Sequence, residues 1–434
     1  MSDLLTLLQL TETSLILPAR ILGALLFLCG LATLLAHALR RRAFCLHPIA
    51  GSIMLFLFAG ALLSCNLLIW GLALVIYIIC GLVFVIADKK AGRKGRHLLP
   101  GPTQKRPLRI AVNCLALVFV LALFLPYFGA GYAYQLFFCG RYDRDALAYE
   151  VSDYEGLLCE EVPFTSDLGQ TLSGCLFSYE DGTDKRGVVV FAHGYSCGGF
   201  NPYLGCIDYF AAHGYYVFAY DATANGVSEG TSMIGLPHQL IDLDYAIQTV
   251  EGLDATSGLP IVLWGHSWGG YTVTNELALH PEIKAVACLS GFDTAMDLIY
   301  AWGVNFVGKP LTLYAYPYLC LQLKLHCGDL AFVSASDALD ESDAGVMIIS
   351  ADNDSVVPTV YGYDLWYERY ADDDRFVFIS RTGIPEKDAH SNVFCSAEYR
   401  ELADADNDNA YLRSHYVDED LFDEILAFYD AWIQ

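Results

Sequence analysis

The segment Trp264–Gly270 constrains the fold of this chain more than any other feature. It follows the apolar run Pro260–Leu263 and precedes Tyr271–Leu279, which has the character of a helix. The sequence therefore predicts a strand, a sharp turn and a helix, with the pattern Gly-x-Ser-x-Gly on the turn. A turn this tight strains the backbone of Ser267 and exposes its hydroxyl, and the two flanking glycines avoid collisions with the neighbouring strand and helix.

Two polar residues that follow this turn have an order that suits nucleophilic catalysis. Val346–Ser350 reads as a buried strand, and Asp354 comes just after it, ahead of a Val-Val-Pro turn. Asp352 is an alternative for the same role. The next predicted strand, Arg375–Ser380, leads into a loop that contains His390. In a catalytic triad His390 would accept the serine proton and return it to the leaving group, while the aspartate would orient the imidazole.

Two earlier loops complete the set of motifs. The predicted strand Gly187–Ala192 ends in His193-Gly194. The loop Asp221–Gly230 is similar to a D-x-R-G-x-G-x-S-x-G pattern in which Thr223-Ala224 replaces the Arg-Gly pair. With the Gly-x-Ser-x-Gly turn and the chain order of serine, aspartate and histidine, the chain resembles the α/β-hydrolase superfamily, in particular its serine aminopeptidase-like and lysophospholipase-like branch. The resemblance covers residues 150–434.

This resemblance implies the remaining parts of a site. The oxyanion hole would consist of the backbone N–H groups of Tyr195 and Trp268, the residues that follow the His-Gly pair and the nucleophile. We expect His193 to brace its loop and to take no part in proton transfer. No Cys-x-x-Cys or Cys/His pattern of the zinc type is present, so we expect no metal and no cofactor.

Residues 139–434 read as one α/β domain. Predicted strands alternate with predicted helices, which favours a mostly parallel sheet with helices on both faces, the α/β-hydrolase fold. Further predicted elements are the strand Tyr215–Tyr220, the helix Leu236–Gly252, the strand Lys284–Ser290 and the helix Leu421–Trp432. Residues 128–150 are expected to be a short tether.

An insertion at about residues 292–344 stands where this superfamily places a lid over the nucleophile. It is rich in apolar and aromatic residues, which include Tyr300, Trp302, Phe306, Leu311, Leu313, Tyr314, Tyr316, Tyr318, Leu319 and Leu321. Two interpretations remain open. The segment either forms an apolar acyl pocket that opens towards a bilayer, or it packs on the sheet.

The first third of the chain, residues 1–138, predicts a region of about four transmembrane helices. Four uncharged apolar runs have roughly the length that crosses a hydrocarbon core, namely Ile21–Leu39, Pro48–Leu68, Gly71–Ala87 and Ile110–Tyr127. The first run lacks a small-residue cleavage site and three others follow it, which argues against a signal peptide.

Basic residues predict the orientation of these spans. Arg40–Arg42 lies between the first and second runs, and Asp88–Arg109 contains eight Lys and Arg residues between the third and fourth. Two spans separate the basic segments, so both lie on one side, which the positive-inside bias makes the cytoplasm. The hydrolase domain would then be extracytoplasmic, on a multi-pass protein of the cell membrane.

The charge of the chain is divided between its two parts. Residues 1–138 hold 12 Lys and Arg against 3 Asp and Glu, whereas the remainder holds 13 against 47, a net charge of −34. A domain this acidic excludes nucleic acid as a partner. We expect Asp372–Asp374 and Glu401–Asp408 to be solvated surface. Nine of the 14 cysteines lie after residue 138, and Cys320 and Cys327 are near enough in sequence to pair.

The sequence thus predicts a membrane-anchored serine hydrolase that cleaves carboxylic esters, with a lipid-like or small acyl ester as substrate. A peptidase of the aminopeptidase-like branch is the alternative enzyme. A membrane sensor that carries a non-catalytic hydrolase domain is the alternative from another class, and the complete triad argues against it.

Overall fold

The computed structural model of this chain describes residues 126–433 except 144–148, 180–183 and 403–415. The chain divides into two compact units, one of which consists of residues 138–312 and 327–434. The described parts of the other are residues 126–137 and 313–326. The predicted membrane spans lie outside the described residues, apart from positions 126–127 of the fourth. No helix within the described part has the length and apolar character that crossing a membrane requires.

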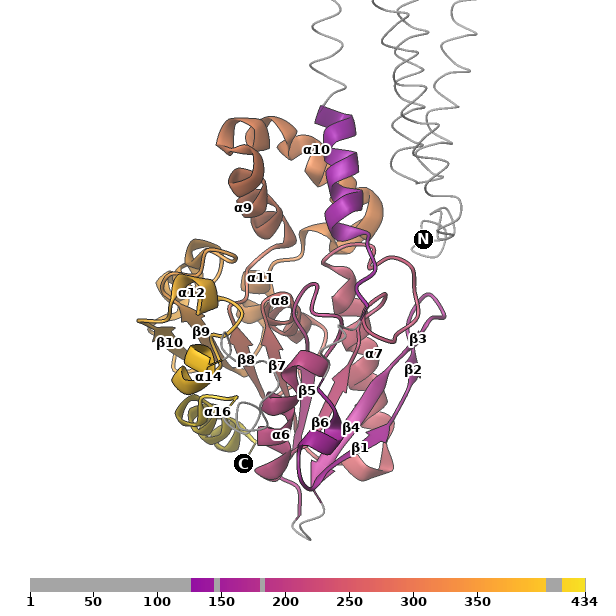
Figure 1. Cartoon of the computed structure of the whole chain (residues 1–434), viewed down its shortest axis with the longest axis vertical. Coiled ribbons are helices and arrows are strands. Elements are labelled where there is room, and N and C mark those ends of the chain that lie inside the picture. The colour runs from indigo at the N-terminus through magenta and orange to yellow at the C-terminus, as the bar shows by residue number, and fades with distance from the viewer. Residues whose placement is uncertain (1–125, 144–148, 180–183, 403–415, 434) are drawn as a thin grey trace, which may run out of the picture. The chain divides into compact units, whose positions relative to one another are not determined.

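The larger unit is built on an eight-stranded sheet with the order β1-β4-β6-β5-β7-β8-β9-β10 (Figure 1). The strands from β6 to β10 are parallel, and β1 and β4 pair antiparallel at one edge. The strands are β1 Leu157–Glu161, β4 Gly174–Tyr179, β5 Val188–Ala192, β6 Tyr216–Tyr220, β7 Ile261–His266, β8 Ala285–Leu289, β9 Gly345–Ala351 and β10 Phe376–Arg381. A separate hairpin joins β2 Phe164–Thr165 to β3 Thr171–Leu172. The predicted mostly parallel sheet is confirmed.

Helices cover both faces of this sheet (Figure 1). Helices α6 and α16 share a core with alternate residues of the strands, among them Phe191, Trp264 and Ala287. Helices α7, α8 and α11 pack together and lie against the strands through α7 and α8. The helices are α6 Leu204–Ala212, α7 His238–Gly252, α8 Trp268–Asn275, α9 Ala295–Val307, α10 Lys309–Cys327, α11 Ala335–Glu341, α12 Tyr363–Tyr370, α13 Glu386–Ala389, α14 Ala397–Leu402 and α16 Glu419–Trp432.

The central strands are buried along their whole length, which explains their sequences. Every residue of β5 and of β8 is buried, because each of these strands has a helix layer on both sides. A parallel strand in that position reads as a continuous apolar run with no alternation. Short 3₁₀ turns complete the unit at Val151–Asp153, Asn201–Tyr203, Asp254–Thr256, Glu276–Ala278, Gly328–Phe332 and Thr359–Tyr361.

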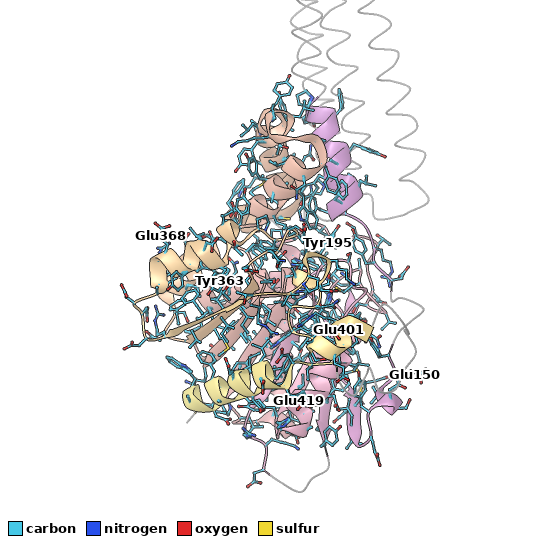
Figure 2. The ribbon with its side chains drawn as sticks, turned by 60° about the vertical axis from the view of Figure 1, so that its left-hand side comes forward. Glu150, Tyr195, Tyr363, Glu368, Glu401 and Glu419 are labelled. Atoms are coloured by element: carbon cyan, nitrogen blue, oxygen red, sulfur yellow. The ribbon has the colours of Figure 1, made fainter. Side chains whose placement is uncertain are left out.

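The acidic surplus of the domain lies at its surface. The side chains of Glu150, Glu368, Glu401 and Glu419, which Figure 2 labels, are all exposed. Asp372–Asp374 is also mostly exposed, as expected for solvated surface. Within the described residues no disulfide joins two cysteines, and Cys320 and Cys327 are not bonded to each other.

The insertion at 292–344 contains several separate helices and does not form a single lid. The predicted tether at 128–150 begins with a helix. Helix α11 belongs to the core layer, with Leu339 fully buried. In the smaller unit, residues 126–137 are helical and pack against the second part of α10. There the ring of Tyr134 lies 4.6 Å from that of His326, and Gln135 donates its side-chain N–H to His326 Nε2 at 2.9 Å. The insertion thus contributes to two different helix contacts, while several of its apolar residues, among them Phe306, Leu311 and Leu313, are exposed.

Candidate active site

The turn between β7 and α8 presents Ser267. Its backbone has φ +57° and ψ −113°, in the left-handed region that side chains other than glycine rarely adopt. The Ser267 N–H donates to the Leu289 carbonyl on β8 at 2.8 Å, which ties the turn to the adjacent strand. The predicted strained strand–turn–helix is thus present, and such strain persists only where the surroundings enforce it.

The two glycines of the turn occupy space that a side chain would need. A Cβ on Gly265 would lie 2.3 Å from the Gly269 carbonyl oxygen, and one on Gly269 would lie 2.0 Å from the Ala192 carbonyl oxygen. Both neighbouring atoms are backbone, so neither moves cheaply. The close packing of β5, β7 and α8 therefore depends on glycine at both positions.

We predict that Gly265→Ala lowers the free energy of unfolding by more than ~3 kcal/mol, because the new methyl group collides with the backbone. Urea unfolding followed by circular dichroism measures the loss. Gly252→Ala at the end of α7 is the matched control, since nothing lies within 4 Å of a Cβ there. The control should change stability by less than ~1 kcal/mol. Equal stability of both variants would contradict the packing argument.

The structure brings Ser267, His390 and Asp354 into one hydrogen-bonded chain. His390 Nε2 lies 2.8 Å from Ser267 Oγ, and His390 Nδ1 lies 2.7 Å from Asp354 Oδ2. All three residues are buried. The arrangement fits the tautomer in which the Nδ1–H donates to the carboxylate and Nε2 accepts the serine proton.

Asp354, and not Asp352, is the carboxylate that contacts the histidine. Burial opposes ionisation of Asp354, but the hydrogen bond and charge of His390 and the N–H groups of Val357 and Val356 outweigh it and lower the pKa. Both N–H groups donate to Oδ1 at 2.9 Å, which leaves Oδ2 for the imidazole. The Asp352 side chain is exposed at the end of β9.

The loop after β5 is held by buried polar contacts. His193 is fully buried and donates from Nδ1 to the Gly194 carbonyl at 2.8 Å, while its Nε2 accepts from the Ala222 N–H at 3.0 Å. Burial lowers the pKa of His193, so the imidazole is neutral and both nitrogens are engaged. These contacts are those of a bracing residue. Asp221 accepts from the N–H groups of Phe200 and Val227, and so ties this loop to the next.

In the loop Asp221–Gly230, where Thr223-Ala224 replaces the Arg-Gly pair, the backbone still adopts a positive φ. Ala224 stands where the pattern has glycine, and its φ is +59°. An alanine in this conformation carries a cost of roughly 1–2 kcal/mol. The Thr223 hydroxyl and N–H both donate to the buried carboxylate of Asp242, at 2.9 and 2.7 Å. These contacts hold the segment in place without the Arg-Gly pair.

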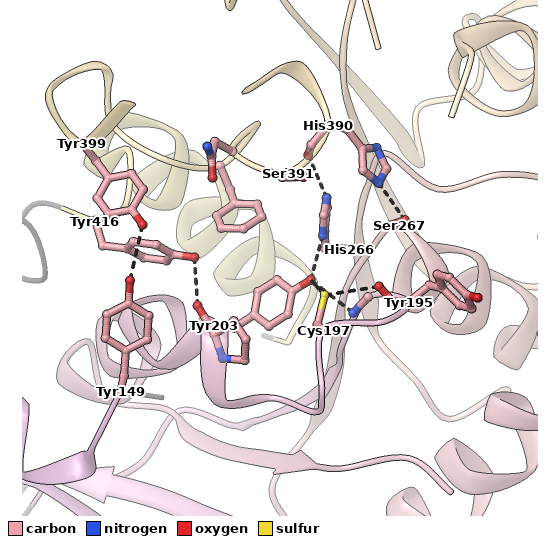
Figure 3. Close-up of a pocket in the computed structure, with 14 residues that line it drawn as sticks. Tyr149, Tyr195, Cys197, Tyr203, His266, Ser267, His390, Ser391, Tyr399 and Tyr416 are labelled. Carbon is pink, nitrogen blue, oxygen red and sulfur yellow. Dashed lines mark hydrogen bonds between the residues drawn. The ribbon is translucent and has the colours of Figure 1, made fainter. Parts of the chain in front are cut away.

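Tyr195 and Trp268, whose N–H groups the resemblance implies as oxyanion donors, both lie beside Ser267. Trp268 is the first residue of α8 and follows Ser267 directly. Tyr195 lines the same cavity as Ser267 and is labelled in Figures 2 and 3. The two rings are 6.2 Å apart at an angle of 74°. Their position matches the expectation, and their role as donors stays a prediction.

Sequence reasoning missed His266, which links the two loops of the site. The Tyr203 hydroxyl lies 2.9 Å from His266 Nδ1 and accepts the Gly194 N–H at 3.2 Å. His266 Nε2 lies 2.9 Å from the His390 carbonyl oxygen, as Figure 3 shows. Burial and the charge of His390 lower the pKa of His266 to about 3, so the ring is neutral and Nε2–H donates. The sequence could have indicated only its side of the sheet. Side chains alternate along a strand, so His266 lies on the same face of β7 as Trp264.

We expect His266→Ala to reduce kcat by up to about 10²-fold with little change in KM, because it releases the backbone that positions the imidazole of His390. Steady-state kinetics on one ester substrate give both constants. An unchanged kcat in a variant with a normal unfolding midpoint would show that the contact does not position the histidine.

A cavity of about 270 Å³ opens beside Ser267 (Figure 3). Besides Ser267 and His390, its walls are mainly aromatic and carry hydroxyl groups. The lining side chains include Tyr149, Tyr195, Tyr203, Phe394, Tyr399 and Tyr416. None of the described residues that line this cavity comes from 292–344.

One residue of the insertion does contact the site region. Trp302 on α9 donates its indole N–H to the Val356 carbonyl at 3.0 Å, in the turn that follows Asp354. Its ring lies 5.3 Å from that of Tyr195 and stacks on Phe138 at 6.0 Å. Trp302 therefore connects α9 with the turn that follows Asp354 and with the loop after β5.

Comparison with known proteins agrees with this architecture. The family described as alpha/beta hydrolase fold matches residues 187–326. No curated protein matches the chain in sequence. The larger unit, with its mostly parallel sheet and helices on both faces, has the α/β-hydrolase fold.

Among solved structures, three similar ones are named for hydrolytic enzymes. An esterase from Pyrococcus furiosus is 16% identical, with a TM-score of 0.48 over 69% of this chain and 100% of that chain. An acetyl xylan esterase from a Thermoanaerobacterium species is 14% identical, with a TM-score of 0.38 over 55% of this chain and 78% of that one. An acylaminoacyl peptidase from Pyrococcus horikoshii is 17% identical, with a TM-score of 0.39 over 54% of this chain and 38% of that one.

Proposed function

We propose that this chain is a serine hydrolase that cleaves carboxylic esters through an acyl-enzyme intermediate. The observation that carries the proposal is the chain of hydrogen bonds from Ser267 through His390 to Asp354 at the edge of a cavity. Serine is a weak nucleophile by itself and needs an adjacent base, which must in turn be oriented by a third group. All three roles have a residue here.

The reaction follows from these positions. Ser267 Oγ attacks the ester carbonyl carbon as its proton moves to His390 Nε2, and the backbone N–H groups of Tyr195 and Trp268 stabilise the oxyanion. The intermediate collapses, and the alcohol leaves with the proton from His390. Water then repeats the sequence on the acyl-enzyme, releases the acid and restores the serine. Asp354 remains ionised throughout and stabilises the imidazolium.

The cavity favours a neutral, compact acyl group. Among the described residues that line it, none is an aspartate, glutamate, lysine or arginine, so no described side chain of its wall would pair with the ammonium group of a free amino terminus. Burial of an unpaired charge costs several kcal/mol. A volume of about 270 Å³ also suits a short or single-ring acyl group better than a long chain. This observation favours an esterase over the peptidase alternative.

A substrate panel tests the choice. The full chain is assayed on p-nitrophenyl acetate, butyrate, benzoate and palmitate and on aminoacyl p-nitroanilides, with Ser267→Ala as the blank. We expect kcat/KM on the short esters to exceed that on the aminoacyl amides by at least ~10². A preference for the amides would replace the proposal with the peptidase, and absence of serine-dependent turnover on every substrate would favour the non-catalytic alternative.

We further propose that residues 1–138 anchor the hydrolase domain, residues 139–434, in the cell membrane, with the domain outside. The support is the four apolar runs, the basic segments Arg40–Arg42 and Asp88–Arg109, and the acidic remainder of the chain. Protease added to intact cells or spheroplasts should digest the hydrolase domain and spare the Asp88–Arg109 loop. Activity of a C-terminal reporter that works only in the cytoplasm would contradict both the span count and the location.

A further inference from the structure

A second cluster of titratable side chains lies at the opposite end of α8 from Ser267. Glu276 and His280 come from the turn that follows α8, and Asp244 comes from α7. One donor atom from each of the three lies within 4.8 Å of the others, and no other set of this kind is present in the described residues. Glu282, just before β8, contacts the same histidine.

Glu276 is the unusual member of this cluster. Its side chain is 0% exposed, and neither carboxylate oxygen has a hydrogen-bond partner. Burial raises its pKa, and the negative charges of Asp244 and Glu282 raise it further. A buried carboxylate without a hydrogen bond is costly and rare in native proteins. Its Oε1 points at His280 Nε2 from 3.6 Å, too far for a hydrogen bond but close enough to share a third group with it.

The spacing of the donor atoms matches that of a metal site. His280 Nε2 lies 3.0 Å from Asp244 Oδ1 and 3.6 Å from Glu276 Oε1. Two ligands on a tetrahedral zinc with bonds of about 2.0–2.1 Å are roughly 3.3 Å apart, which falls between these two distances. Asp244 Oδ1 also accepts a hydrogen bond from Gln248 at 2.6 Å, an orienting contact of the kind that ligating carboxylates have.

The remaining nitrogen of the histidine is occupied as it is in metal sites. His280 Nδ1 lies 2.5 Å from Glu282 Oε1, so the Nδ1–H donates to that carboxylate. His280 Nε2 lies within hydrogen-bond distance of Asp244 Oδ1, so the ring nitrogen that faces Asp244 and Glu276 would exchange that hydrogen bond for a bond to the metal ion. A carboxylate behind a ligating imidazole is the usual arrangement in metal sites. Asp244 is 29% exposed, so water has access to complete the coordination.

We propose that Asp244, Glu276 and His280 bind a divalent metal ion of the zinc class, which joins α7 to the segment after the nucleophile helix. Mixed imidazole and carboxylate donors suit such an ion, and two carboxylates neutralise its charge. The site is structural and not catalytic, because α8 lies between Glu276 and Ser267 and its eight residues span about 12 Å. The sequence-based expectation of no metal is replaced by this proposal.

Metal content and thermal unfolding test the site without any measurement of hydrolysis. The full chain in mild detergent, without a histidine tag, is stripped with EDTA and titrated with zinc chloride. We expect one equivalent bound and a melting temperature higher by roughly 5 °C when free zinc is 100-fold above Kd. Glu282→Gln removes the carboxylate behind His280 and should weaken zinc binding by about 10–100-fold.

Glu276→Gln is the decisive variant, and Glu251→Gln on the exposed face of α7 is its matched control. The amide has the shape of the carboxyl group but cannot ionise, so the metal-free variant should be at least as stable as the metal-free parent and should gain no stability from zinc. Asp244→Asn, at a partly exposed position, gives the same test if Glu276→Gln fails to fold. If the parent and Glu276→Gln bind equal amounts of zinc with equal melting temperatures, the cluster is a network of side chains without a metal ion and the proposal is wrong.

Discussion

Ser267→Ala is expected to lower the ester turnover of this chain by a factor on the order of 10⁶, as loss of a triad nucleophile does in a comparable serine hydrolase. The proposed acyl-enzyme forms on this serine, and His390 Nε2 lies 2.8 Å from its Oγ. The substitution removes one hydroxyl and keeps a Cβ in the same left-handed backbone, so it introduces no new collision. Steady-state assays on p-nitrophenyl acetate measure the loss.

Stability is the control for that variant. Its urea unfolding midpoint should match that of the parent within error, and its circular dichroism spectrum should be unchanged. Turnover within tenfold of the parent in a folded Ser267→Ala protein would show that the ester bond is broken elsewhere.

Asp354→Asn should reduce kcat by about 10⁴, because an amide at this position leaves His390 in the wrong tautomer. The carboxylate accepts the Nδ1–H of His390 at 2.7 Å, and an asparagine that turned its NH₂ group to that nitrogen would stabilise the opposite proton position. The two N–H groups of Val356 and Val357 should hold the asparagine oxygen in place of Oδ1, so the fold persists.

Asp352→Asn is the matched comparison for this change. It alters the same chemical group two residues away, but the side chain is exposed and lies outside the triad. We expect a loss of less than threefold in kcat. The reverse ranking of the two variants would mean that the carboxylate of the triad has been assigned wrongly.

The sequence predicted the architecture well where local chemistry and tertiary packing agree. Strands such as β5 and β8 are buried on both faces, so an unbroken apolar run is enough to identify them. The turn at Ser267 was predictable because glycines at 265 and 269 are required by atoms that the same motif brings close. Asp354 and His390 follow strand ends, and the ends of parallel strands converge on one edge of a sheet.

Features that depend on contacts between distant segments were not predictable. The cavity beside Ser267 is built from residues 149, 194–203, 390–399 and 416, which no local pattern brings together. The insertion at 292–344 looked like one apolar lid, but composition does not reveal that α11 packs on α8 while the second part of α10 packs on residues 126–137. Glu276 reads as an ordinary charged helix residue until its burial is known.

His266 illustrates a third case. The sequence shows a histidine next to the nucleophile, and without tertiary information that residue is as easily a general base as a support. The hydrogen bond to the His390 carbonyl and the contact with Tyr203 distinguish the two roles. The alternation of side chains along β7 indicates the face on which His266 lies, but only the folded structure shows which residues it contacts.

The most direct test of the proposed chemistry is covalent trapping of the nucleophile. The folded chain is incubated with a fluorophosphonate, and intact-mass analysis followed by peptide mapping locates the adduct. We expect one phosphonyl group per chain, carried by Ser267, with labelling abolished in Ser267→Ala and strongly slowed in Asp354→Asn. A folded parent protein that hydrolyses esters but carries no adduct on Ser267, or carries it on another residue, would contradict the account.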